Sequence, residues 1–103
     1  MFGRQVTMKL KPDAAWEFLR LNRTVVNRIL CEQHGFLSET IHLDPKRSDV
    51  VVNSLWDTKE DAASYDKTGY LETLKLLADV VEGTPMVKTF ELAIAPMLIA
   101  IAA

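Results

Sequence analysis

The sequence has little of several residue types that often define a protein class, and cysteine is the scarcest. Cys31 is the single cysteine, so the chain can form no intramolecular disulfide, no thiolate zinc cluster and no Cys-x-x-Cys redox pair. The segment from Met1 to Arg4 also lacks the charged start and apolar run of a signal peptide. We therefore expect a reducing, cytoplasmic setting for this protein.

Positive charge and histidine are also limited. The chain has 12 Lys and Arg against 14 Asp and Glu, a formal net charge of -2, and the basic residues are scattered. This distribution offers no basic stripe for a phosphate backbone, so we expect no nucleic-acid partner. The two histidines, His34 and His42, have no acidic partner at metal-ligand spacing, which disfavours a catalytic metal.

A long hydrophobic run is missing as well. The apolar tail from Leu92 to Ala103 contains Pro96 and is shorter than the run of about 20 apolar residues that a membrane-spanning helix needs. We therefore expect no membrane partner. Left unsheltered, residues 97–99 would form an exposed apolar patch, so residues 96–103 are predicted to pack on the domain or on a partner subunit.

The remaining composition is that of one folded domain. Of the 103 residues, 49% are hydrophobic and 25% are charged, which is typical of a globular chain and not of a disordered one. A chain of this length is too short to divide into two cores, because domains typically contain about 100 to 150 residues. We predict one domain over residues 1–95, followed by the tail at 96–103.

Hydrophobic periodicity predicts elements in the order β-α-β-β-α-β. Alternation with a period of two is typical of strands, whereas apolar residues every three and four positions are typical of helices. The expected strands cover residues 2–10, 36–43, 50–56 and 86–94, and the expected helices cover residues 13–33, 57–66 and 70–81. The last helix is expected to bury Leu71, Leu74 and Leu77 and to stop at residues 83–85.

This order predicts a ferredoxin-like α+β fold, with a four-stranded antiparallel sheet and the helices on one face. We place the strands at 2–10 and 50–56 in the centre and, from the rule of right-handed crossovers, expect these two to run parallel. Residues 50–52 are all valine, so that strand is apolar on both faces and needs a second cover. Another subunit or a ligand cavity must supply it, and a second copy packed face to face would give a dimeric barrel around a shared apolar pocket.

Two segments carry a resemblance to a known family. Residues 32–36, Glu-Gln-His-Gly-Phe, are similar to a Glu-Pro-Gly turn into a second strand, and residues 55–62 are similar to a Trp-x-Asp-x-Glu-Ala entry to a second helix. Tyr65 and the Thr-Gly-Tyr run at 68–70 complete the match. In these features the chain resembles the antibiotic biosynthesis monooxygenase domain family over roughly residues 2–93.

The resemblance implies a dimeric α+β barrel that oxidises a phenolic, quinol or anthrone-like molecule with O₂, without a metal, flavin or other cofactor. The chain departs from the family at two places. Many members have His where this chain has Tyr65, and an acidic residue just before the tryptophan, where this chain has Ser54 and Leu55. The Asn, Trp and His of the haem-degrading branch would fall on Gln5, Tyr65 and Lys75, and none matches, so haem degradation is disfavoured.

The resemblance singles out three aromatic residues. Tyr65 takes the place of a family His or Trp, and as a phenol with a pKa near 10 it is better suited to orient a substrate oxygen than to remove a proton. Trp56 is assigned to substrate binding, with a core or interface anchor as the alternative. Tyr70, which completes the match, is assigned to substrate binding as well.

Polar residues on the strands and on the first helix complete the candidate site. His42 is the pocket candidate suited to proton transfer near neutral pH, provided that its face of the strand lines the pocket. Arg4 and Gln5 cannot both point inward, and we assign Gln5 to the pocket together with Asn53. Asn22 interrupts the apolar stripe of the first helix and faces either the pocket rim or a buried partner. For each of these residues a structural role is the alternative.

Three functions stay open on these grounds. The first is a cofactor-independent monooxygenase acting in the pocket of a homodimer, which the match over residues 56–70 favours. The second is a non-catalytic or stress-related dimer that binds a small hydrophobic molecule, which the missing His and acid favour. The third is an interaction dimer whose apolar tail recruits a partner.

Overall fold

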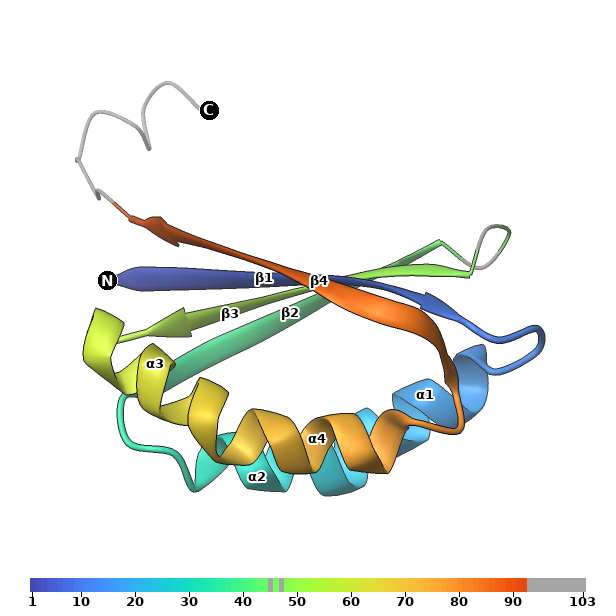
Figure 1. Ribbon diagram of the computed structural model, residues 1–103, viewed down its shortest axis with the longest axis horizontal. Helices are drawn as coiled ribbons and strands as arrows, with labels where there is room; N and C mark the ends of the chain where they lie inside the picture. The colour runs from blue at the N-terminus through green and yellow to red at the C-terminus, as the bar shows by residue number, and fades with distance from the viewer. Residues whose placement is uncertain (45, 47, 93–103) are drawn as a thin grey trace.

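The sheet and its helical cover form two layers. The computed structural model describes residues 1–44, 46 and 48–92 of the chain. All helices in this part lie on one side of the four-stranded sheet, as Figure 1 shows. The elements are β1 (Phe2–Leu10), α1 (Ala15–Leu21), η1 (Asn22–Val26), α2 (Asn27–Cys31), β2 (Phe36–Asp44), β3 (Asp49–Trp56), α3 (Lys59–Lys67), α4 (Gly69–Leu77) and β4 (Val81–Glu91). The predicted ferredoxin-like α+β class is confirmed.

The strands are ordered β2-β3-β1-β4, so β1 and β3 occupy the centre as predicted. These two strands run antiparallel, which corrects the expectation of a parallel pair. The reason is that each helical crossover skips one strand position, and the β2–β3 hairpin reverses the chain before β3 pairs with β1. The whole sheet is therefore antiparallel.

The first helical segment matches its predicted range closely but contains a π-helical stretch, η1. There the N–H of Asn27 donates to the carbonyl of Asn22, five residues earlier, instead of four. The buried stripe of this segment includes one polar residue, Asn22, as the sequence pattern indicated. Its buried members are Phe18, Asn22, Val26, Ile29 and Leu30.

The second helical segment begins where it was predicted. Thr58 is its N-cap, and the Thr58 hydroxyl oxygen accepts a hydrogen bond of 3.1 Å from the Asp61 N–H. The last helix, α4, buries Gly69, Thr73 and Leu77, which are spaced four residues apart along one face. That spacing turns Leu71 outward, so it is 51% exposed and its predicted burial was wrong.

The last strand begins five residues earlier than predicted, at Val81 in place of residue 86. Residues 83–85 were expected to stop the preceding helix, which instead ends at Leu77. They lie within β4, at a shift of its register against β1, where Gly83 has a φ of 73°. The glycine and proline of this segment therefore mark a bulge in a strand, and not the end of a helix.

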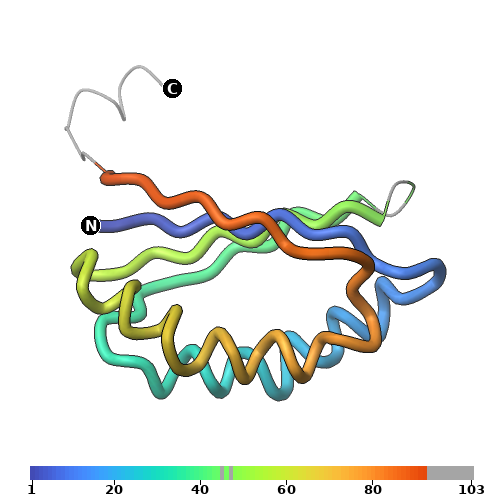
Figure 2. The backbone as a smooth tube through the Cα atoms, in the orientation of Figure 1, coloured from blue at the N-terminus to red at the C-terminus, as the bar shows by residue number. Residues whose placement is uncertain are grey.

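The core lies between the two layers. Its largest fully buried side chains are Trp56, Phe18, Leu10, Leu30 and Val50, and burying such a side chain contributes about 1.5–3 kcal/mol. In Figure 2 the two ends of the described chain lie side by side, and the Leu92 N–H donates to the Met1 carbonyl at 2.9 Å. No helix in the described ranges is long and apolar enough to cross a membrane. The predictions for residues 93–95 and for the tail at 96–103 lie outside the described residues.

Candidate functional site

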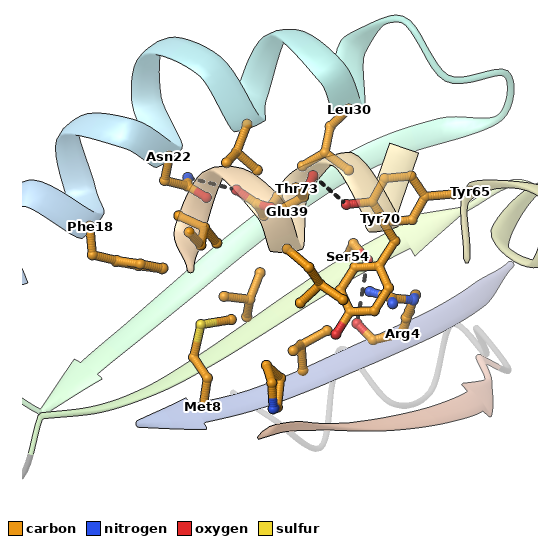
Figure 3. Close-up of a pocket in the computed structure, with 16 residues that line it drawn as sticks. Arg4, Met8, Phe18, Asn22, Leu30, Glu39, Ser54, Tyr65, Tyr70 and Thr73 are labelled. Carbon is orange, nitrogen blue, oxygen red and sulfur yellow. Dashed lines mark hydrogen bonds between the residues drawn. The ribbon is translucent and has the colours of Figure 1, made fainter. Parts of the chain in front are cut away.

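A cavity opens between the sheet and the helices of a single chain. It holds about 490 Å³ of space free of atoms, including the part open to solvent. Its wall is mostly apolar. The polar side chains in it, shown in Figure 3, are Arg4, Asn22, Glu39, Ser54, Tyr65, Tyr70 and Thr73. This cavity differs from the pocket expected from the sequence, which was to lie between two copies on the other face of the sheet.

Three of these polar side chains form one row across the sheet. The strand register pairs Glu39 of β2 with Ser54 of β3, and Ser54 with Arg4 of β1. With neighbouring strands about 4.8 Å apart, the Cα atoms of Glu39 and Arg4 are roughly 10 Å apart. The rows on either side are apolar and consist of Ile41, Val52 and Val6, and of Phe36, Trp56 and Phe2. The polar row is thus a single band in an apolar surface.

Arg4 is a buried cation at one end of this row. Its side chain is 3% exposed, its Nε donates to Asp66 Oδ1 at 2.8 Å, and its Nη2 lies 2.7 Å from the same oxygen. The contact of Nη2 is an ion pair without hydrogen-bond geometry, so Nη2 has no acceptor among the described residues. The guanidinium carbon lies 4.0 Å from the centre of the Tyr70 ring and 5.1 Å from that of Tyr65. A buried donor without an acceptor therefore borders the cavity.

Glu39 is the carboxylate at the other end of the row. Asn22 Nδ2 donates to Glu39 Oε1 at 3.0 Å, which gives the buried amide of η1 its partner. Burial raises the pKa of Glu39 above its usual value of 4.5, and the hydrogen bond from Asn22 opposes part of this rise. Both side chains line the cavity.

Tyr65 is held in place by a short chain of hydrogen bonds. Its hydroxyl lies 3.3 Å from Thr73 Oγ1, and the Thr73 hydroxyl donates to the Gly69 carbonyl at 3.0 Å. Because the proton of Thr73 is used in this way, Tyr65 is the donor to Thr73, and its oxygen is left to accept. Burial raises the pKa of Tyr65 above its usual value of 10.0. Tyr65 is therefore a neutral orienting group and a poor base.

Two further aromatic rings contact Tyr65. The Trp56 ring is fully buried, its centre lies 5.1 Å from that of Tyr65, and its Nε1 donates to Ser54 Oγ at 3.0 Å. Trp56 is absent from the described cavity wall and supports Tyr65 from the core. The Tyr70 ring lies 6.0 Å from Tyr65 and does line the cavity. Gly69 leaves room for this cluster, because a Cβ atom there would lie 2.9 Å from the Tyr65 ring.

His42, Gln5 and Asn53 lie on the face of the sheet that carries no helices. Gln5 and Asn53 are cross-strand neighbours, and Gln5 Nε2 donates to Asn53 Oδ1 at 3.1 Å. His42 is exposed on β2. They do not line this cavity, because strand alternation directs Arg4 and Ser54 toward the helices instead, and they lie on the open face, where the shared pocket was expected from the sequence. No group of three or more His, Cys, Asp and Glu side chains in the described ranges is arranged to hold a metal ion.

Sequence reasoning missed the two charged residues of the cavity. Arg4 was weighed against Gln5, and Gln5 was assigned to the pocket expected on the open face, where it lies. For Glu39 a signal was present, since it has the same parity as Ile41 and Leu43, the apolar residues of its strand. An acidic residue in an apolar series indicates either an interrupted strand or a buried functional group.

Comparison with solved structures shows the fold. No protein-family model and no curated protein matches the chain significantly. SnoaB, a cofactor-independent oxygenase from Streptomyces nogalater, is 14% identical and has a TM-score of 0.72 over 92% of this chain and 95% of that one. A proposed antibiotic biosynthesis monooxygenase from Nitrosomonas europaea is 18% identical, with a TM-score of 0.71 over 88% of this chain and 97% of that one.

A third structure, a proposed antibiotic biosynthesis monooxygenase from Caulobacter crescentus, is 14% identical and has a TM-score of 0.74 over 89% of each chain. At these identities the likeness concerns the backbone arrangement and not the side chains of the site. The resemblance expected from the sequence is confirmed at the level of the fold, because structures with this fold include proteins of the antibiotic biosynthesis monooxygenase type.

Proposed function

We propose that this protein is a cofactor-independent monooxygenase that oxidises a small phenolic, quinol or anthrone-like molecule with O₂ inside this cavity. The observation that carries the proposal is the buried Arg4 guanidinium in a mostly apolar wall, whose Nη2 lies 2.7 Å from Asp66 Oδ1 but makes no hydrogen bond among the described residues. Such a donor matches an oxygen that becomes negatively charged during the reaction. The fold shared with SnoaB, a cofactor-independent oxygenase, supports the same reaction class.

The proposed reaction of an anthrone-like substrate converts a ring CH₂ group into a carbonyl. A base takes one proton, and the electron pair of the C–H bond delocalises onto the ring oxygen. The carbanion passes one electron to O₂, and the radical and superoxide then combine and take up a proton to give a hydroperoxide. Loss of the second proton with cleavage of the O–O bond yields the carbonyl and water. One O₂ is consumed for each substrate molecule.

The cavity side chains have distinct roles in this scheme. Arg4 donates to the substrate oxygen, and the apolar wall strengthens this interaction by excluding water. Tyr70 presents its ring to an aromatic substrate, while Tyr65 orients a substrate hydroxyl through the free acceptor of its own oxygen. Trp56 fixes the Tyr65 ring by stacking on it.

We propose further that the protein works as a homodimer in which the two open sheet faces meet. The open face exposes Met86 by 65% and Phe90 by 38%. Covering this surface with a second copy contributes about 25 cal/mol per Å² of apolar area. His42, Gln5 and Asn53 would then lie at the subunit interface, and any role of theirs belongs to a space shared by the two copies.

Oxygen uptake tests the proposed reaction. We expect metal-free and flavin-free protein to accelerate O₂ consumption with anthrone, at one O₂ per substrate. Arg4→Met should lower kcat/KM by about 10²–10³-fold, the usual effect of losing one oxyanion donor. Lys9→Met is the matched control, because it removes a cation from the open face of the same strand, and it should leave the rate unchanged. Uptake no faster than in buffer, or an unaffected Arg4→Met variant, would contradict the proposal.

A second candidate function is binding of a small hydrophobic molecule without turnover. It is favoured by Tyr65, which stands where the family resemblance would favour His and whose hydroxyl is already bonded to Thr73. This alternative predicts that anthrone or anthraquinone binds in the cavity while the wild-type protein consumes no O₂. Calorimetric titration alongside the uptake assay separates the two functions.

A further inference from the structure

Glu39 is placed as a proton acceptor would be. Among the described residues that line the cavity it is the one carboxylate. Its Oε1 accepts from Asn22, a contact that is dashed in Figure 3, and Oε2 has no hydrogen-bond partner among the described residues. A carboxylate held through one oxygen keeps the other available for a substrate proton.

The backbone of the first helical segment is adapted to this contact. The π-helical stretch η1 begins at Asn22, the residue that reaches across the interlayer space to β2. A π-helical turn adds one residue to the turn and redirects the side chains around it, and such turns occur often at functional sites. Asn22 is also buried, with 8% exposure, although an apolar residue would suit the stripe better. Both features are explained if Asn22 serves to position Glu39.

The surroundings of Glu39 are partly polar and carry one cation. It shares the cavity wall with Asn22 from η1, Tyr65 from α3, Tyr70 and Thr73 from α4, and Arg4 from β1. Arg4 is the cation of this set, and its counterion Asp66 is 42% exposed. Burial, with the Asn22 bond opposing it, places the pKa of Glu39 above that of an ordinary carboxylate, nearer to neutral pH, where a general base is more effective.

We infer that Glu39 is the catalytic residue that takes the substrate proton and that Asn22 is its positioning residue, an assignment that rests on the proposed function. Glu39 Oε2 removes a proton from a ring C–H or O–H, and the electron pair moves through the ring to the oxygen held by Arg4. Protonated Glu39 then returns its proton to the peroxide that O₂ forms. The substrate class follows: a neutral aromatic molecule with an acidic hydrogen and a conjugated oxygen at opposite ends of one ring.

The span between the two groups agrees with this class. Glu39 and Arg4 are two strand positions apart, or roughly 10 Å between their Cα atoms. One six-membered ring with a contact of about 3 Å at each end bridges two side chains at such a separation.

Hydrogen exchange without oxygen tests the base directly. We expect the wild-type protein to accelerate deuterium incorporation into the anthrone methylene group in anaerobic D₂O, measured by proton NMR. Glu39→Gln keeps the shape and the acceptor for Asn22 but cannot take a proton, so it should lose about 10²–10⁴-fold of the acceleration. Glu32→Gln changes an exposed carboxylate that directly follows α2 and does not line the cavity, and this control should retain the acceleration.

The outcomes separate this inference from the proposed function. Equal exchange in wild type and Glu39→Gln overturns the role of Glu39, whereas O₂ uptake can still establish the monooxygenase. Exchange that depends on Glu39 without any O₂ uptake supports the base and contradicts the monooxygenase. Absence of any acceleration by the wild type overturns the role of Glu39, whatever the uptake assay gives.

The positioning role of Asn22 has its own readout. Asn22→Leu removes the hydrogen bond that lowers the pKa of Glu39, so the acidic limb of the exchange rate should move to higher pH. A residue that only fills space would change the rate at all pH values by the same factor. An acidic limb at the wild-type position in Asn22→Leu would therefore contradict this role.

Discussion

The two faces of the central sheet each carry a polar row, one residue apart along the strands. On the covered face the row is Glu39, Ser54 and Arg4, and on the open face it is Thr40, Asn53 and Gln5. The covered row holds two charged side chains beside a cavity, whereas the open row holds a neutral amide pair that satisfies itself. Residues adjacent in the sequence thus lie in opposite environments, because successive side chains of a strand point to opposite faces.

This difference shows that the position of a polar residue along its strand, odd or even, decides whether it lies beside the cavity and can take part in chemistry there. A charge on the covered face has lost water, so its interactions are strong, and burial raises the pKa of Glu39. A polar group on the open face keeps water until a partner covers it. The functional assignment therefore follows from the face that the helices cover, and each experiment below compares the two faces.

The largest expected difference is in stability. Arg4→Ala should lower the free energy of unfolding by about 2–4 kcal/mol, because it removes a buried ion pair and the stacking on two tyrosine rings. The exposure of Asp66 keeps this loss below that of a fully buried pair. Lys9→Ala, on the open face of the same strand, should change it by about 0.5 kcal/mol or less. Urea unfolding of both variants measures the difference. Equal losses of unfolding free energy in the two variants would contradict the expected contrast between the two faces.

The next effect concerns subunit association. Val51→Lys on the open face should weaken the homodimer by about tenfold or more, because a two-fold interface brings the two new charges together. Leu71→Lys makes a similar change on the exposed side of α4 and should leave association intact. Sedimentation analysis of both variants measures the strength of dimer association. A dimer that survives Val51→Lys but not Leu71→Lys would place the interface on the helical layer.

A smaller effect is expected in the pH dependence of stability. The pKa of Glu39 is raised in the folded state, so its ionisation opposes folding once the pH rises from the unfolded value of 4.5 through the folded value. Glu39→Gln should therefore be more stable than wild type at neutral pH, and the difference should shrink at lower pH. Thr40→Ala on the open face should give no such pH-dependent difference. Unfolding curves between pH 4 and pH 8 measure the free energy of unfolding of wild type and of Glu39→Gln. A difference between the two proteins that stays constant over this range would contradict the burial of Glu39.

The smallest effect is the coupling within the open row. The hydrogen bond between Gln5 and Asn53 is only partly buried. A double-mutant cycle with Gln5→Ala and Asn53→Ala should give a coupling of about 0.2–1 kcal/mol, the range of a cross-strand pair. A coupling well above this range would show that the open face is more enclosed than its exposure in one chain indicates.

Most of the fold could be predicted from the sequence, because periodicity and turn residues indicate elements without reference to the rest of the molecule. The hairpin at 36–56 and the Thr58 cap are examples of such local signals. The direction of β3 against β1 and the start of β4 were missed, since they depend on long-range pairing. Gly83 illustrates the problem, because glycine in a strand bulge and glycine after a helix look alike in the sequence.

The candidate site could be predicted only in part. The family resemblance identified Tyr65 and Tyr70, and the apolar stripe identified Asn22, all of which line the cavity. Arg4 and Glu39 were missed because burial of a charge depends on which strand face the helices cover. Which face the helices cover depends on how the two layers assemble, and the residue pattern of a single strand does not indicate it.

A crystal structure with bound anthraquinone, a carbonyl analogue that cannot be oxidised further in this way, tests the central claim most directly. We expect the ligand between the sheet and the helices, with one carbonyl oxygen within hydrogen-bond distance of Arg4 Nη2 and its ring against Tyr70. Anthraquinone bound on the open face of the sheet, with Arg4 untouched, would contradict the account.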